Sequence, residues 1–190
     1  MNARLLPALI VGLVLPLSAA ETKPAVSKAV PVTATFYINE VKCSTCVNAL
    51  EESLRKLPTV TKVDNLSEST GLAVVTFDPK TVSYQQVAQA IFATAPVHND
   101  PYTASLKFTI SDYAKGDNAA KLNALFAKHK HEVRVEVKNK ARGECVLFFE
   151  QLRVIAGKKG PQGWNLDEFV SAIQEPAPKG LGLTFALTSE

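Results

Sequence analysis

Apolar and polar residues alternate along several short segments of the chain, and this period of two is typical of strands with one buried face. In residues 32–38 valine, alanine, phenylalanine and isoleucine alternate with threonine and tyrosine. In residues 133–137 valines alternate with charged side chains, which is the clearest strand pattern in the sequence. Further strands are expected at residues 60–63, 72–77, 104–110, 144–150 and 181–187.

Other segments carry apolar residues at helical spacing. A first helix is expected over residues 47–57, with charged residues opposite its apolar side and Pro58 at its end. Ser83 and Gln86 form a capping-box pattern before a second helix that reaches Thr94. Two later helices are expected after the candidate caps Asp117 and Asn165, with Glu168 three residues beyond the latter.

The order of these elements predicts an α+β fold. Residues 32–96 give strand, helix, two strands and helix, which is one strand short of a ferredoxin-like βαββαβ sandwich. The second half repeats the full β-α-β-β-α-β order without obvious sequence identity. We therefore expect two such sandwiches in tandem, at residues 32–100 and 101–190, the second one degenerate. The strand at 104–110 completes the first unit, begins the second, or does both.

The N-terminus has the pattern of a secretory signal peptide. Arg4 precedes a short apolar run, and the small residues Ser18, Ala19 and Ala20 mark a cleavage site. We expect residues 1–20 to be removed and residues 21–31 to form a flexible leader. The mature chain is then exported, to the periplasm or the extracellular space. No later segment is long and apolar enough to cross a membrane.

Charge and cysteine content narrow the possible functions. The net charge is +3 at pH 7, and loss of Arg4 leaves +2. This weak bias gives no reason to expect binding to nucleic acid or to an anionic membrane surface. The chain has three cysteines, an odd number that suits a site better than a disulfide scaffold. No combination of residues indicates catalysis, so we do not expect an enzyme.

The candidate site is the C-x-x-C pair Cys43 and Cys46, on the turn between the first strand and the first helix. Thiolates are soft ligands, and two of them suffice for near-linear binding of Cu(I) or mercury. The positive end of the helix favours thiolate over thiol, and Lys42 is expected to add positive charge. A structural zinc site needs four ligands, and no second pair occurs.

Residues 32–96 resemble the heavy-metal-associated (HMA) domain family, which includes copper chaperones, modules of copper-transporting ATPases and the periplasmic mercury-binding protein. The matching segments are F-Y-I-N-E-V-K-C-S-T-C, V-N-A-L-E-E-S-L-R-K-L, P-T-V-T-K-V and A-V-V-T-F-D-P. The resemblance implies a ferredoxin-like fold that holds one soft ion between Cys43 and Cys46 and passes it to a protein partner. Cu(I) is the expected ion, with Hg(II) and Zn(II) as alternatives.

The sequence of residues 32–96 departs from the family pattern in two places. The family usually has Gly-Met-Thr or Gly-Met-His before the first cysteine, where this chain has Glu40, Val41 and Lys42. Val41 can replace the methionine in the core. The aromatic residue or lysine that the family often places after the second helix is not found at residues 95–97. Residues 112–118 of the second half lack a C-x-x-C, so that half is expected to serve packing or partner docking.

Two other functions stay open for the cysteine pair. One is an exported interaction or scaffold module, in which the thiols are vestigial or joined in a disulfide. The other is thiol–disulfide exchange, which the absence of tryptophan beside the motif disfavours, because Trp164 is far away in sequence. Among other candidates, Cys145 is expected in the core, while His129, His131 and His98 are weaker metal-ligand candidates.

Overall fold

The structure is a computed structural model that describes residues 30–154 and 160–188. The predicted signal peptide, and the leader before residue 30, lie outside these residues. The elements in chain order are β1 (Val32–Ile38), α1 (Ser44–Arg55), β2 (Lys62–Asp64), β3 (Leu72–Phe77), α2 (Tyr84–Phe92), β4 (Ala104–Ile110), α3 (Asn118–Lys128), β5 (Val133–Asn139), β6 (Glu144–Phe149), α4 (Leu166–Gln174) and β7 (Phe185–Leu187).

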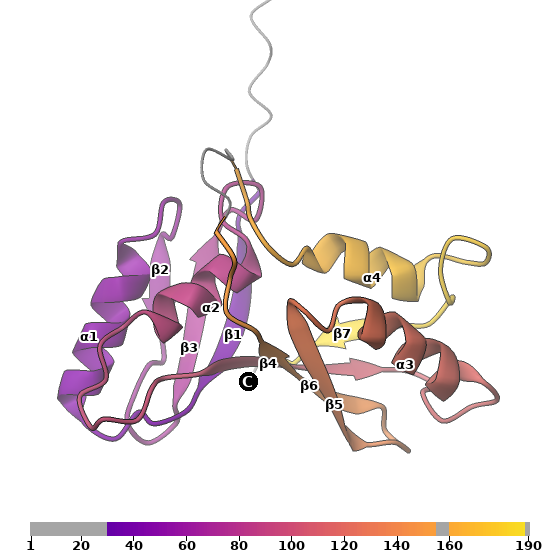
Figure 1. Ribbon diagram of the computed structural model, residues 1–190, viewed down its shortest axis with the longest axis horizontal. Helices are drawn as coiled ribbons and strands as arrows, with labels where there is room; N and C mark the ends of the chain where they lie inside the picture. Colours follow the sequence, from indigo (N-terminus) through magenta and orange to yellow (C-terminus); the bar gives the residue numbers. More distant parts are fainter. Residues whose placement is uncertain (1–29, 155–159, 189–190) are drawn as a thin grey trace, which may run out of the picture.

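Within the described residues, seven strands form one antiparallel sheet, accompanied by four helices. The strand order is β2-β3-β1-β4-β6-β5, and β7 also pairs with β4. One edge of β4 pairs with β6. The other edge pairs with β1 at Ala104 and Ser105, and with β7 from Phe108 to Ile110. Figure 1 shows β4 between the two groups of strands, and it therefore belongs to both.

The two groups have the same connections. β1, β2, β3 and β4 have spatial order β2-β3-β1-β4, and β4, β5, β6 and β7 have the matching order β5-β6-β4-β7. Corresponding glycines support this match. Gly71 and Gly143 have φ of 59° and 64°, a region that favours glycine. Their carbonyls accept hydrogen bonds from Ile38 (2.7 Å) and Ile110 (3.0 Å), the last residues of β1 and β4.

One face of the sheet carries a single core under all four helices. Phe36 of β1 packs against Tyr84 of α2 and Phe149 of β6, with ring centroids 6.3 and 6.1 Å apart. Phe169 of α4 contacts Phe126 of α3 at 5.9 Å. The core also contains the α1 residues Cys46, Leu50 and Leu54 and the β4 residues Leu106, Phe108 and Ile110. The alternation in the sequence thus corresponds to burial on one face.

The element predictions hold best for strands with two neighbours. The strands at 32–38, 72–77 and 104–110 have the predicted bounds. The last strand begins at Phe185 and not at Leu181, because residues 181–183 donate their N–H groups to carbonyls at the end of α4. β2 begins at Lys62, since the N–H of Val60 bonds back to Leu57.

The helix caps are confirmed in two cases and corrected in one. Ser83 and Gln86 form the expected capping box of α2. The Asn165 side chain accepts from the N–H groups of the second and third residues of α4. Asp117 precedes α3 but makes no side-chain cap hydrogen bond. Its carboxylate instead pairs with Lys121 at 3.0 Å, one turn further along the helix.

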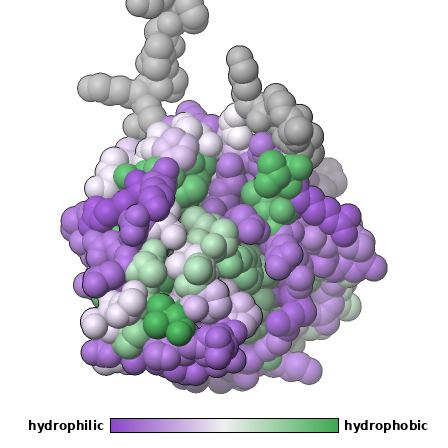
Figure 2. Space-filling view, turned by 60° about the vertical axis from the view of Figure 1, so that its left-hand side comes forward, coloured by the Kyte–Doolittle hydropathy of each residue, from purple (hydrophilic) through white to green (hydrophobic). Residues whose placement is uncertain are grey.

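The face of the molecule that Figure 2 shows is mostly polar. None of the helices in residues 30–154 and 160–188 combines the length and apolar character needed to cross a bilayer. On the face in Figure 2, apolar residues form separate patches between polar ones. The large apolar residues that are exposed in the described segments are Val30, Val97 and Val154. Val97 lies in the loop between α2 and β4, beside the candidate site.

Candidate metal centre

The loop between β1 and α1 places the first cysteine at the start of the helix. Glu40 has φ of 68°, in the left-handed region that glycine adopts freely and that costs other residues about 1 kcal/mol. The loop therefore has a glycine-type conformation although glutamate occupies the position. Val41 is 8% exposed and packs into the core. Cys43 follows as the N-cap residue of α1.

The two sulfurs converge at this helix start. The Sγ atoms of Cys43 and Cys46 are 3.0 Å apart, and both cysteines are free. A disulfide would bring them to about 2.0 Å. The Cys46 N–H donates to the Cys43 sulfur at 3.3 Å, so this sulfur acts as the cap acceptor of α1. Cys46 is buried and Cys43 is half-buried, which leaves access to the pair from the Cys43 side.

The surroundings of Cys46 favour its thiolate. Burial alone would raise the pKa of this thiol. Four hydrogen bonds act in the opposite direction and lower the pKa of Cys46 to about 6. They come from the Cys43 thiol, the Tyr102 hydroxyl and the backbone N–H groups of Lys42 and Cys43. Burial and the bond to Cys46 raise the pKa of Tyr102, so its hydroxyl remains a donor. Cys46 is therefore a ready ligand for a thiophilic ion at neutral pH.

This lowered pKa predicts a specific pH dependence in the reduced, metal-free protein. Thiolate absorbance near 240 nm should rise with a midpoint near pH 6, and a Cys46→Ser variant should lack that step. The pKa of Cys46 is lower in the folded state than in the unfolded state, where a thiol pKa is near 8.5. Ionisation of Cys46 therefore stabilises the folded protein. This stabilisation is complete above the unfolded pKa and is lost as pH falls through the folded value of about 6. The free energy of unfolding should therefore rise between these values. No thiolate signal below pH 8 would contradict this account.

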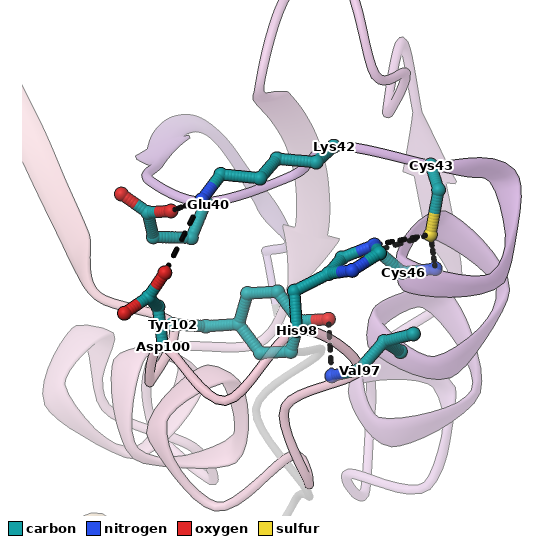
Figure 3. Close-up of polar contacts among 8 residues, drawn as sticks. All are labelled: Glu40, Lys42, Cys43, Cys46, Val97, His98, Asp100 and Tyr102. Carbon is teal, nitrogen blue, oxygen red and sulfur yellow. Dashed lines mark hydrogen bonds and ion pairs between the residues drawn. The ribbon is translucent and has the colours of Figure 1, made fainter.

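Lys42 contributes differently from the sequence-based expectation. Its ammonium group pairs with Glu40, and with Asp100 at 3.2 Å. Figure 3 shows the side chain extending away from the Cys43 sulfur towards these carboxylates. Two negative charges thus balance its positive charge. Its backbone N–H, however, donates to Cys46 and helps to lower the pKa of that thiol. The expected contribution of the lysine charge was wrong.

The loop between α2 and β4 brings two further side chains to the sulfurs. The Nε2 atom of His98 is 3.2 Å from the Cys43 Sγ. Tyr102, in the same loop, is buried, and its hydroxyl donates a hydrogen bond to Cys46. An aromatic residue therefore stands beside the site, although residues 95–97 lack one. Ligand atoms of Cys43, Cys46 and His98 all lie within 4.8 Å of one another.

The other histidines are not part of such a group among the described residues. His129 is the C-cap residue of α3 and lies 3.6 Å from a Glu132 oxygen. Its ring is nearly perpendicular to that of Phe169, with the ring centroids 5.7 Å apart. His131 is exposed on the following turn. The sequence does not separate His98 from the other two histidines, yet it is the one beside the thiols.

The remaining sequence candidates lie in the core of the second group of strands. Cys145 is 2% exposed on β6, and burial raises the pKa of its thiol to about 11. It was predicted as a core residue, and this is confirmed. Trp164 is buried against Phe149 and Phe169. In the loop between β4 and α3, which corresponds to the loop between β1 and α1, Tyr113 is buried and its hydroxyl donates to Asn123.

The geometry of the pair suits one soft ion. Twice a metal–sulfur bond of about 2.3 Å limits the separation of two sulfurs on one ion to about 4.6 Å. The observed separation of 3.0 Å lies inside this limit, so the sulfurs must open by about 1.6 Å for linear binding and by less for a bent arrangement. Cys43, as the half-buried member, is the one with room to move.

Comparisons with known proteins give only distant similarity. No protein-family model matches the sequence, and no curated protein matches it. The chain is similar to a structure of the water-soluble region of the P-type ATPase CopA from Bacillus subtilis, with a TM-score of 0.37, 16% identity, and coverage of 84% of this chain and 92% of that one. It is also similar to a solution structure of the N-terminal soluble domains of Bacillus subtilis CopA. There the TM-score is 0.36 and the identity 16%, with coverage of 84% of this chain and 95% of that one. TM-scores below 0.5 do not establish a common fold.

Proposed function

We propose that this protein is an exported, non-enzymatic carrier of a soft metal ion, which it holds between Cys43 and Cys46 and passes to a protein partner. The observation that carries the proposal is the pair of free sulfurs 3.0 Å apart at a helix start. The lowered pKa of Cys46 supports it, since the thiolate is the form that binds metal.

For the fold, the proposal is more specific than a seven-stranded sheet with four helices. We interpret the chain as two ferredoxin-like βαββαβ units that share β4, the first of them HMA-like. The spatial order β2-β3-β1-β4 and the position of the cysteine pair between β1 and α1 support this interpretation. The second unit has no cysteine at its corresponding loop and serves packing or docking.

Cu(I) is the ion that this ligand set favours. Two sulfurs satisfy a low-coordinate soft ion, and a nearby imidazole adds a ligand that copper also accepts. Hg(II) shares the preference for two thiolates. Zn(II) usually takes four ligands, and the described residues near the pair supply three. A partner that contributes a further ligand would complete a zinc site, so Zn(II) ranks last.

Transfer to a partner requires that the ion be reachable. Cys43 is half-buried and His98 is exposed, while Cys46 is buried beneath them. A partner ligand would therefore meet the ion on the side of Cys43 and displace Cys46 last.

Export rests on the sequence of residues 1–20 alone and is tested by fractionation of cells that express the full chain.

A Cu(I) titration of the reduced protein against a chromogenic chelator tests the proposed function. We expect one tightly bound ion for each chain at pH 7. A thiol count on protein isolated without reductant separates this function from a disulfide-bonded scaffold. A Cys43–Cys46 disulfide together with no uptake of Cu(I) after mild reduction would overturn the proposal.

A further inference from the structure

His98 lies beside the cysteine pair. Its Nε2 atom is 3.2 Å from the Cys43 sulfur, which is hydrogen-bond distance for a ring nitrogen and a thiol. The imidazole comes from the loop between α2 and β4, whereas both cysteines belong to the start of α1. Figure 3 shows its ring beside the Cys43 sulfur. An ion bound to the pair would therefore lie within reach of this nitrogen.

The loop that carries His98 is anchored on both sides of the histidine. Before it, the Val97 N–H donates to the Tyr102 hydroxyl at 3.4 Å. After it, Asn99 turns the chain with φ of 68°, and the Asp100 carboxylate pairs with Lys42 at 3.2 Å. An unanchored exposed loop would lose conformational entropy on binding an ion. These contacts order the loop beforehand.

Lys42 joins this loop to the loop that carries the cysteines. It pairs with Asp100 of the first loop and with Glu40 of its own loop, and it directly precedes Cys43. The Asn39 N–H also donates to the Thr103 carbonyl at 3.1 Å, which joins the same two loops. The ion pair between Lys42 and Asp100 therefore fixes the distance between His98 and Cys43, because Asp100 is two residues from the histidine and Lys42 is next to the cysteine.

We propose that His98 is a third ligand of the ion held by Cys43 and Cys46, and that the ion pair between Lys42 and Asp100 positions its imidazole. This inference rests on the proposed function and names further residues of the same site. His98 bonds to the ion, whereas Asp100 acts only through the loop. Exposed ion pairs contribute little, so Asp100 is expected to contribute a small factor to Cu(I) affinity and His98 a larger one.

A double-mutant cycle with Cu(I) and the chromogenic chelator tests both parts. We expect His98→Ala to weaken Cu(I) binding about tenfold or more, and Asp100→Asn about twofold to fivefold. In the His98→Ala background, Asp100→Asn should have no further effect, because it acts through the histidine. The matched control is Asp117→Asn, which removes an exposed carboxylate paired with Lys121 at 3.0 Å. This control should bind Cu(I) like the unmodified protein.

Nitrogen NMR of the imidazole supplies a readout that a structural role would not change. On addition of Cu(I), the Nε2 resonance of His98 should shift, while those of His129 and His131 should not. Unchanged Cu(I) affinity in His98→Ala, or an unshifted His98 resonance, would overturn the third ligand. If Asp100→Asn weakened Cu(I) binding equally in the unmodified protein and in the His98→Ala variant, the positioning role of the ion pair would be overturned. If the unmodified protein binds no Cu(I), the proposed function itself is wrong, and the roles of His98 and Asp100 fall with it.

Discussion

Replacing Cys43 and Cys46 together with serine is expected to reduce Cu(I) affinity by about a thousandfold or more. Serine keeps the size of the side chain but offers a neutral hydroxyl in place of a soft thiolate. The Cys43 sulfur also accepts the Cys46 N–H, and a serine hydroxyl can replace that helix cap, so the fold should survive. Competition with a chromogenic chelator measures the affinity, and circular dichroism checks the fold.

The matched control for this double variant is Cys145→Ala. It removes the cysteine that lies buried on β6, in the core and outside the cysteine–histidine group. We expect it to bind Cu(I) as tightly as the unmodified protein, with some loss of stability from the smaller side chain. Equal Cu(I) affinity in the double serine variant and in this control would show that the pair does not hold the ion.

Replacing Gln85 with leucine is expected to lower the free energy of unfolding by about 3 kcal/mol or more. This α2 side chain is 2% exposed and bridges the two groups of strands. Its amide nitrogen donates to the carbonyls of Glu132 (3.2 Å) and Glu150 (2.9 Å), and its oxygen accepts from the backbone N–H of Trp164 at 2.7 Å. Leucine would leave the Glu150 carbonyl and the Trp164 backbone N–H without this partner, whereas the Glu132 carbonyl keeps its bond from the Glu150 N–H at 2.9 Å. Urea denaturation measures the change.

Two further variants make this prediction specific. Gln85→Glu keeps an acceptor for the Trp164 N–H but places a buried carboxylate against two carbonyls, so it should destabilise at least as much. Gln174→Leu removes an exposed glutamine with a single hydrogen bond, of 3.2 Å, to Phe185. It should cost less than about 1 kcal/mol. A similar small cost for Gln85→Leu would mean that water replaces the buried amide.

Much of the fold follows from the alternation of apolar and polar residues. The strands at 32–38, 72–77 and 104–110 have the predicted bounds, because each has two neighbours and one buried face. The sequence leaves the role of the strand at 104–110 open, since local pattern carries no information about which strands pair. Its two edges show that it does both: Ala104 and Ser105 pair with β1, and Phe108 to Ile110 with β7.

The site is only partly readable from the sequence. The spacing of Cys43 and Cys46 at a strand-to-helix turn predicts that their sulfurs converge. His98 and Tyr102 reach them through the pairing of Ile38 with Ala104, which brings the end of one loop beside the start of another. That contact is long-range and has no local signal. The predicted strand order does carry a hint, since the fourth strand of such a unit starts beside the end of the first.

The charge of Lys42 illustrates a second limit. A lysine next to a cysteine suggests a positive field on the sulfur, but side-chain direction depends on partners elsewhere in the chain. Here Glu40 and Asp100 draw the ammonium group away, and the backbone N–H of the same residue supports the Cys46 thiolate.

X-ray absorption at the copper edge of the Cu(I)-loaded protein tests the central claim most directly. This measurement identifies the atoms bonded to the ion and needs no variant. We predict two sulfur ligands for each copper, from the pair whose Sγ atoms lie 3.0 Å apart in the free protein. Copper surrounded only by nitrogen and oxygen would contradict the account.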